Sequence, residues 1–265
     1  MRMNDRSHVR TARAFLALAL SCTACAQAQT GSYAPGALAF GSQTVTTMSA
    51  PQTITIANTH ATASFQVNGF SNGNPTRFPF VAGGSCAAPP FTLAAGDSCT
   101  VRIAFLPDSV SSFSTGFFVT STTPATTFAP TRVDLSGTGT PVPGVLAPDA
   151  LAFGEVPSFA TSAAMEVSIG NAATTATLTI VTLTTTNPSR FFFVPGGTCP
   201  MLPFPLAAGA SCTVQIAFRP DAVGGYGGSF FVGSTTPQAS FTPASVFLSG
   251  TGGPDRVFSD GFEGL

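Results

Sequence analysis

The chain has 265 residues, of which 8% are charged and 44% are hydrophobic, and ten Lys plus Arg against eleven Asp plus Glu give a net charge of -1. All ten cations are arginines. A protein with so few cations lacks the basic surface that binds nucleic acid or anionic lipid through phosphates. The 25 phenylalanines supply ample apolar area for a core, so the composition also excludes a disordered chain.

The first 28 residues follow the pattern of a signal peptide. Four arginines precede the apolar stretch Ala14–Leu20, and the small-residue sequence Ala-Gln-Ala follows at 26–28. The apolar stretch is too short to span a bilayer, and we expect cleavage after Ala28, with Ala26 as the alternative. Cleavage after Ala28 leaves six arginines against ten acids, a net charge of -4. The sequence therefore predicts an exported protein of the periplasm, cell surface or exterior, with no transmembrane segment in its mature form.

Two cysteines, Cys22 and Cys25, lie near the end of the apolar stretch and raise a second interpretation, a lipoprotein acylated on one of them. Neither has a leucine three residues before it, so we expect cleavage without lipidation. The last residues, 258–265, resemble neither a sorting motif nor an apolar helix with a basic flank. The mode of anchoring is therefore left open by the sequence.

The rest of the chain contains one unit written twice. Residues Leu38–Gly139 return as Leu151–Gly252 with a constant offset of 113 positions and no gap. About half of the matched positions are identical. Two copies of one folding unit are therefore expected.

Apolar residues alternate with small polar residues through each unit, the pattern of a sheet with one buried face. Residues 53–56 alternate threonine with isoleucine, and residues 101–105 and 214–218 place valine, isoleucine and phenylalanine at every second position. Turn signals such as the Asn-Gly-Asn-Pro sequence at 72–75 divide each unit into about seven strands. The sequence therefore predicts an all-β protein of two tandem immunoglobulin-like antiparallel β-sandwiches.

The expected organisation has five parts. They are a signal peptide over residues 1–28, a first sandwich over 31–139, a Pro-rich linker over 140–148, a second sandwich over 149–252 and a flexible tail over 253–265. Three prolines in the nine linker residues favour a stiff, extended connection. We therefore expect the two sandwiches to lie end to end as a short rod.

Four cysteines remain after the predicted cleavage, and the duplication indicates how they pair. Cys86 and Cys99 are separated by 13 positions in the first unit, and Cys199 and Cys212 have the same spacing in the second. Pairing within each unit closes each unit on itself, and such disulfides persist in oxidising compartments. Zinc binding would need further Cys or His ligands nearby, and a redox pair would need cysteines close together at a helix start. We therefore expect two structural disulfides, no metal site and no cofactor.

The motifs of each unit, taken in order, resemble the bacterial choice-of-anchor D repeat. They include Leu-Ala-Ala-Gly at 93–96, Ser-Cys-Thr-Val at 98–101 and Leu-Ser-Gly-Thr-Gly at 135–139, each repeated 113 residues later. That repeat is similar to the ASPM, SPD-2 and Hydin domain, an immunoglobulin-like sandwich. The resemblance covers nearly the whole predicted mature chain and implies an extracytoplasmic, non-enzymatic module.

Candidate catalytic groups are scarce, and we assign none. His60 is the one histidine outside residues 1–28, and Ala173 replaces it in the second unit, so we expect a solvated loop histidine rather than part of a hydrolytic triad. Charged residues match between the units at only two positions: Arg77 corresponds to Arg190, and Asp108 corresponds to Asp221. We expect them to form one intradomain ion pair in each unit, with a ligand site as the alternative.

Strand alternation directs several phenylalanines away from the core. If Phe117 points inward, its neighbour Phe118 points outward, and the same parity turns Phe231 and Phe247 outward in the second unit. Phe192 is expected to join them in an exposed patch, which would mark an interface. Two alternatives remain: another domain or a loop covers these rings, or a bulge reverses the parity of one strand.

These observations favour an exported structural or protein-interaction module of the bacterial cell envelope or exterior, without catalytic activity. Its partner would be another protein or envelope component, or a second copy of the chain. A carbohydrate-binding or adhesive protein is the alternative, although the scarcity of Tyr and Trp argues against sugar stacking. An enzyme would need a cleft with convergent titratable groups, which the sequence hardly supplies.

Overall fold

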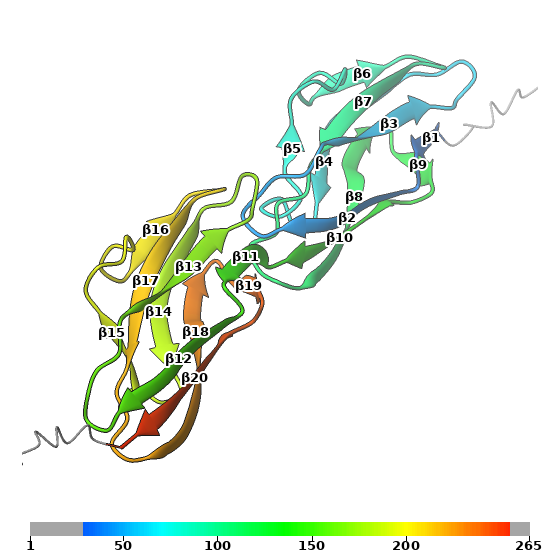
Figure 1. The fold of residues 1–265 in the computed structure, drawn as a ribbon. Helices are drawn as coiled ribbons and strands as arrows, with labels where there is room; N and C mark the ends of the chain where they lie inside the picture. The colour runs from blue at the N-terminus through cyan, green and yellow to red at the C-terminus, as the bar shows by residue number, and fades with distance from the viewer. Residues whose placement is uncertain (1–28, 255–265) are drawn as a thin grey trace, which may run out of the picture.

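The computed structural model describes residues 29–254, which form twenty β-strands and no helix. They build two β-sandwiches that lie end to end, each made of two five-stranded sheets (Figure 1). The predicted fold class is confirmed: the described chain is all-β, with two tandem immunoglobulin-like sandwiches. Within this range there is also no helix that is long and apolar enough to cross a membrane. The predicted signal peptide and residues 255–265 of the expected tail lie outside the described residues.

The first sandwich has the sheet orders β5-β7-β3-β1-β9 and β2-β10-β8-β4-β6. β1 pairs in parallel with β9 and β2 with β10, and the other neighbours are antiparallel. Its strands are β1 (Gln29–Ala34), β2 (Ala37–Thr44), β3 (Gln52–Asn58), β4 (Phe65–Asn72), β5 (Phe80–Val81), β6 (Phe91–Leu93), β7 (Ser98–Ile103), β8 (Ser112–Thr123), β9 (Thr126–Ala129) and β10 (Val133–Thr140).

The second sandwich repeats this topology with the orders β15-β17-β13-β11-β19 and β12-β20-β18-β14-β16. Each sandwich thus has ten strands rather than about seven, because short strands extend both sheets at their edges. The strands are β11 (Val142–Ala147), β12 (Ala150–Pro157), β13 (Met165–Asn171), β14 (Leu178–Thr185), β15 (Phe191–Val194), β16 (Phe204–Leu206), β17 (Ser211–Phe218), β18 (Gly224–Thr236), β19 (Ala239–Thr242) and β20 (Val246–Gly253).

The expected linker over residues 140–148 is wrong, because most of it is a strand of the second sandwich. Residues 142–147 form β11, which pairs antiparallel with β13 and in parallel with β19. β10 ends at Thr140, so Pro141 alone separates strands of the two sandwiches. The prolines suggested a connection, but buried and exposed residues alternate along β11. At the other end, Gly253 belongs to β20 rather than to the expected tail.

Phenylalanines that alternate with outward residues fill both cores. Eight of them are fully buried: Phe65, Phe78, Phe105 and Phe117 in the first sandwich, and Phe191, Phe204, Phe218 and Phe230 in the second. The glycine in the middle of each Leu-Ser-Gly-Thr-Gly motif makes room for one of these rings. A Cβ atom at Gly137 would lie 2.6 Å from the Phe105 ring, so a larger residue there would displace part of the core.

Val45 connects the two sandwiches. Its side chain is buried and groups with the core of the second sandwich, which includes Val142, and its N–H donates to the Thr140 carbonyl oxygen at 3.0 Å. Ser158 occupies the matching position of the second sandwich, and its hydroxyl donates to the Gly253 carbonyl oxygen at 2.9 Å. At this position the first sandwich has the apolar Val45, which packs against the second sandwich, and the second sandwich has the polar Ser158 near the end of the described chain.

Candidate interaction surfaces and supporting contacts

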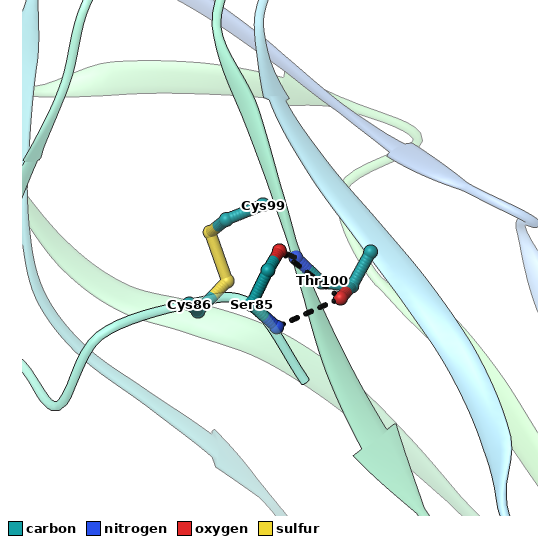
Figure 2. Close-up of a disulfide and its surroundings, with 4 residues drawn as sticks. All are labelled: Ser85, Cys86, Cys99 and Thr100. Carbon is teal, nitrogen blue, oxygen red and sulfur yellow. Dashed lines mark hydrogen bonds between the residues drawn. A yellow bond between two sulfur atoms is a disulfide. The ribbon is translucent and has the colours of Figure 1, made fainter. Parts of the chain in front are cut away.

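A disulfide joins Cys86 and Cys99 in the first sandwich, with their Cα atoms 4.8 Å apart. Cys99 lies on β7, and Cys86 lies in the loop after β5, so the bond ties this loop to the sheet. Ser85 and Thr100 reinforce the attachment, because each backbone N–H donates to the other residue's hydroxyl oxygen at 2.9 Å (Figure 2). The Cys86 N–H also donates to the Thr100 carbonyl oxygen at 3.0 Å. The loop between β5 and β6 is therefore held at its centre.

The second sandwich has the same attachment through the Cys199–Cys212 disulfide, again with a Cα separation of 4.8 Å. Thr198 replaces the serine, and its hydroxyl oxygen accepts a hydrogen bond from the Thr213 N–H at 2.9 Å. Gly197 permits the close approach of loop and strand, since a Cβ atom there would lie 2.2 Å from the Thr213 carbonyl oxygen. Both disulfides are of the kind that persists in an oxidising environment.

Arg77 and Asp108 form a two-point ion pair on the surface of the first sandwich. The Arg77 Nε donates to Asp108 Oδ1 at 2.7 Å, and a terminal guanidinium nitrogen donates to Oδ2 at 2.8 Å. The guanidinium also lies over the ring of Phe113, 4.5 Å from its centre. The hydrogen bond from Arg77 lowers the pKa of the Asp108 carboxyl below its ordinary value, and the Ser109 hydroxyl acts in the same direction. This pair joins the turn before β5 to the loop after β7.

The second sandwich places Arg190 against Asp221 in the same way. Tyr226 replaces Phe113 and adds a hydrogen bond from its hydroxyl to Asp221 Oδ1 at 2.7 Å. Arg190 lies 5.9 Å from the centre of the Tyr226 ring. These contacts are the expected intradomain ion pairs, and both partners of each pair are engaged with their own sandwich.

Phe231 and Phe247 lie on one outer face of the second sandwich. Phe247 on β20 pairs with Ser229 on β18, two residues before Phe231, so the two phenylalanines are diagonal neighbours on the same side of the sheet. Phe247 is 69% exposed and Phe231 is half-buried. Phe118 occupies the matching outer face of the first sandwich and is also exposed.

Phe192 does not join this patch, which corrects the expectation. It lies on β15, where it pairs with Ala217 of β17, and these strands belong to the opposite sheet of the second sandwich. Alternation along a strand shows on which side a residue points but not to which sheet the strand belongs.

The outer face around Phe231 and Phe247 carries uncharged residues. Its outward positions next to them in the strand register are Ala150, Ala152, Thr184, Ser229 and Ser249. The first sandwich differs at this point, since Asp134 replaces Phe247 and pairs with Arg132 at 2.7 Å between Oδ1 and Nε. A charged pair in one unit thus corresponds to an exposed aromatic ring in the other. We call the face around Phe231 and Phe247 the phenylalanine face.

His60 lies in the loop between β3 and β4, as expected. Its Nδ1 accepts hydrogen bonds from the backbone N–H groups of Thr62 at 3.3 Å and Ala63 at 3.0 Å. The imidazole therefore stabilises the local turn. Within residues 29–254, no three or more His, Cys, Asp or Glu side chains are grouped so that they could hold a metal ion.

Two clefts lie beside the disulfides at matching positions, and no motif shared by the two units marks them. The cleft of the first sandwich has a volume of about 180 Å³, and that of the second about 360 Å³. In the sequence, the second cleft is indicated only by residues that differ between the units, such as Leu183 for Phe70 and Gln215 for Arg102.

Comparisons with known proteins found no matching family model and no matching curated protein sequence. Among solved structures, a protein of unknown function from Porphyromonas gingivalis W83 is 12% identical, with 83% of this chain and 99% of that chain covered and a TM-score of 0.31. The ASH/PapD-like domain 7 of human CEP192 is 16% identical over 42% of this chain and 85% of that chain, with a TM-score of 0.27. The Yersinia pseudotuberculosis adhesin InvE is 10% identical over 84% of this chain and 58% of that chain, with a TM-score of 0.28. At these identities and TM-scores, no functional conclusion follows for this chain.

Proposed function

We propose that this protein is an exported, non-enzymatic structural module of the bacterial cell envelope or exterior, which associates with a second copy of itself through the phenylalanine face. The phenylalanine face is the observation that carries the proposal. The resemblance to choice-of-anchor D repeats and the two disulfides support an extracytoplasmic location.

The absence of charged side chains on this face permits a second copy to occupy it. The predicted mature chain carries a net charge of -4, so two copies repel each other at most orientations. The outward positions next to Phe231 and Phe247 carry no charge, so contact there avoids burying unpaired ions. An exposed aromatic pair on a sheet face provides the apolar anchor that interfaces use.

The test is sedimentation velocity of the mature protein over a wide concentration range. We expect a reversible dimer, and we expect the Phe231→Ser, Phe247→Ser double variant to be a folded monomer. Phe118→Ser is the matched control, because it removes an exposed ring from the equivalent face of the first sandwich and should leave the dimer intact. A wild-type protein that stays monomeric, or a double variant that loses its fold, would contradict the proposal.

Export is tested separately by cell fractionation and mass spectrometry of the N-terminus. The expected product begins at Gln29 and is found outside the cytoplasm. A product that retains residues 1–28 in the cytoplasm would overturn this part of the proposal, and an acylated cysteine at its N-terminus would replace free export with lipid anchoring.

A further inference from the structure

The two clefts beside the disulfides differ in volume and in several of the residues that line them. The smaller cleft belongs to the first sandwich, and its lining includes Phe70, Phe80, Cys86 and Arg102. The larger cleft has Leu183, Phe193, Cys199 and Gln215 at the matching positions. Because the same fold and the same disulfide frame both clefts, the first sandwich serves as an internal reference for the second.

A phenylalanine ring fills part of the first cleft. Phe70 contacts Phe80 edge to face, with ring centres 5.4 Å apart, and lies 6.1 Å from the buried Phe117. In the second sandwich Leu183 replaces Phe70, while Phe193 keeps its edge contact with the buried Phe230 at 6.0 Å. The second cleft therefore lacks one aromatic ring that the first supplies from its own chain.

The edge strand next to the cleft is longer in the second sandwich. β5 has two residues and follows Pro79, whereas β15 has four residues with Phe192 in place of that proline. The Pro79 carbonyl oxygen accepts a hydrogen bond from the Ala104 N–H, so the N–H that proline lacks would face the same neighbour, and its absence keeps β5 short. Short edge strands are a common means of protecting a sheet edge from pairing. This protection is absent at β15.

The outer edge of β15 is open to another strand. Within residues 29–254, β15 pairs only with β17, and on the side facing β17 the Arg190 carbonyl oxygen accepts a hydrogen bond from the Arg219 N–H. Because hydrogen-bonding directions alternate along an antiparallel strand, the main-chain groups of Phe193 face away from β17. The Phe193 side chain lines the cleft and is 42% exposed.

The rim of the cleft is also more apolar and less charged in the second sandwich. Met201 and Leu202, which are 91% and 41% exposed, line it and replace Ala88 and Pro89. Arg102 donates to the Ala82 carbonyl oxygen at 3.3 Å across the first cleft, and Gln215 takes its place in the second. The side chains that line the second cleft are therefore uncharged and mostly apolar, with an adaptable methionine at the mouth. A carboxylate lies beside the lining, since Gln215 Nε2 donates to Glu166 Oε2 at 3.1 Å.

We propose that the β15 edge of the second sandwich binds an extended segment of another protein that adds as a strand and inserts a phenylalanine-sized, uncharged side chain into the cleft. Phe70 in the first sandwich indicates the chemistry of the inserted group. The loss of Arg102 indicates that this group is neutral. The backbone of Phe193 supplies hydrogen bonds to the incoming strand, and the cleft selects its side chain. The β15 edge belongs to the opposite sheet from the phenylalanine face, and this proposal goes beyond the function proposed for that face.

The test uses a fluorescein-labelled nonapeptide in which phenylalanine or valine alternates with serine or threonine, titrated into the mature protein and followed by anisotropy. We expect saturable binding at one site per chain, and at least about tenfold weaker binding when alanine replaces the phenylalanines of the peptide. Leu183→Phe, which fills the cleft, and Phe192→Pro, which shortens the strand, should each weaken binding to a similar extent. Both substitutions introduce the residue that the first sandwich already accommodates, so both variants should fold.

A gain-of-function variant provides the reverse test. Replacing Phe70→Leu, Pro79→Phe and Arg102→Gln together should create a second peptide site in the first sandwich and change the stoichiometry from one to two. Binding that is unaffected by both Leu183→Phe and Phe192→Pro would overturn the proposal. So would binding that is lost in Phe247→Ser, which would place the peptide on the phenylalanine face.

Two further measurements distinguish the occupants. If a chain truncated after Pro254 binds the peptide much more tightly than the full chain, the cleft serves the chain's own following residues, and the proposal fails. If Phe192→Pro abolishes dimers in sedimentation velocity, the occupant is a second copy, and the proposal also fails. A monomeric wild-type protein that binds the peptide would support this site while refuting association through the phenylalanine face.

Discussion

Removal of the Cys86–Cys99 disulfide should destabilise the first sandwich strongly and the second hardly at all. The two cysteines are 13 positions apart, and a closed loop of this length corresponds to about 3 kcal/mol of unfolding free energy in the chain-entropy model. Cys86→Ala with Cys99→Ala leaves the hydrogen bonds between Ser85 and Thr100 in place, so the change isolates the covalent link. For a domain of this size the loss corresponds to a fall in melting temperature of roughly 12–24 °C.

The two tyrosines allow the sandwiches to be followed separately. Tyr33 packs in the core of the first sandwich, and Tyr226 belongs to the second. In a Tyr226→Phe background, the fluorescence of Tyr33 should report urea unfolding of the first sandwich alone, because the chain has no tryptophan. The double alanine variant should show a lower midpoint, and the matched change at Cys199 and Cys212 should not alter it. A loss below about 1 kcal/mol, or equal sensitivity to both changes, would refute this reasoning.

Three further predictions concern single contacts. Phe117→Ala should cost about 3–5 kcal/mol of unfolding free energy because the ring is fully buried, whereas Phe118→Ala should change stability by no more than about 0.5 kcal/mol; equal costs in urea unfolding would show that the alternation is misassigned. Arg77→Ala and Asp108→Ala should be non-additive in stability, and additive losses in a double-mutant cycle would exclude a direct interaction. The pKa of Asp108 is lowered in the folded state, so its contribution is present above the unfolded-state pKa near 4 and is lost as the pH falls through the lower folded-state value. Asp108→Asn should remove this acid-dependent loss, which is measurable as melting temperature against pH.

Local sequence patterns predicted much of this fold because the information lies within one strand or one repeat. The alternation that turns Phe117 inward and Phe118 outward is a property of the strand itself, and the structure has both residues in those orientations. The pairing of Cys86 with Cys99 follows from the repeat, since each unit must close on itself. The strand β11 lies within the expected linker, because the three prolines between residues 140 and 148 favoured a connection over a strand.

The cleft beside β15 shows what pattern reading overlooked. The cleft depends on residues that differ between the two units, such as Leu183 for Phe70 and Phe192 for Pro79. The motifs that define the fold are instead identical in both units. The differing residues are far apart in the sequence and come together only when β14 and β15 lie at the same end of the two packed sheets. Their proximity is therefore visible only in three dimensions.

The amino-acid sequence by itself determined the duplication, the all-β class, the alternation that separates Phe117 from Phe118 and the pairing of the four cysteines in the repeats. Only the tertiary structure decided which sheet each strand joins, and so separated Phe192 from Phe231 and Phe247 and brought Leu183 next to Phe193. The physical reason is that alternation is fixed by the local geometry of the backbone, whereas sheet membership depends on hydrogen bonds between segments distant in the chain.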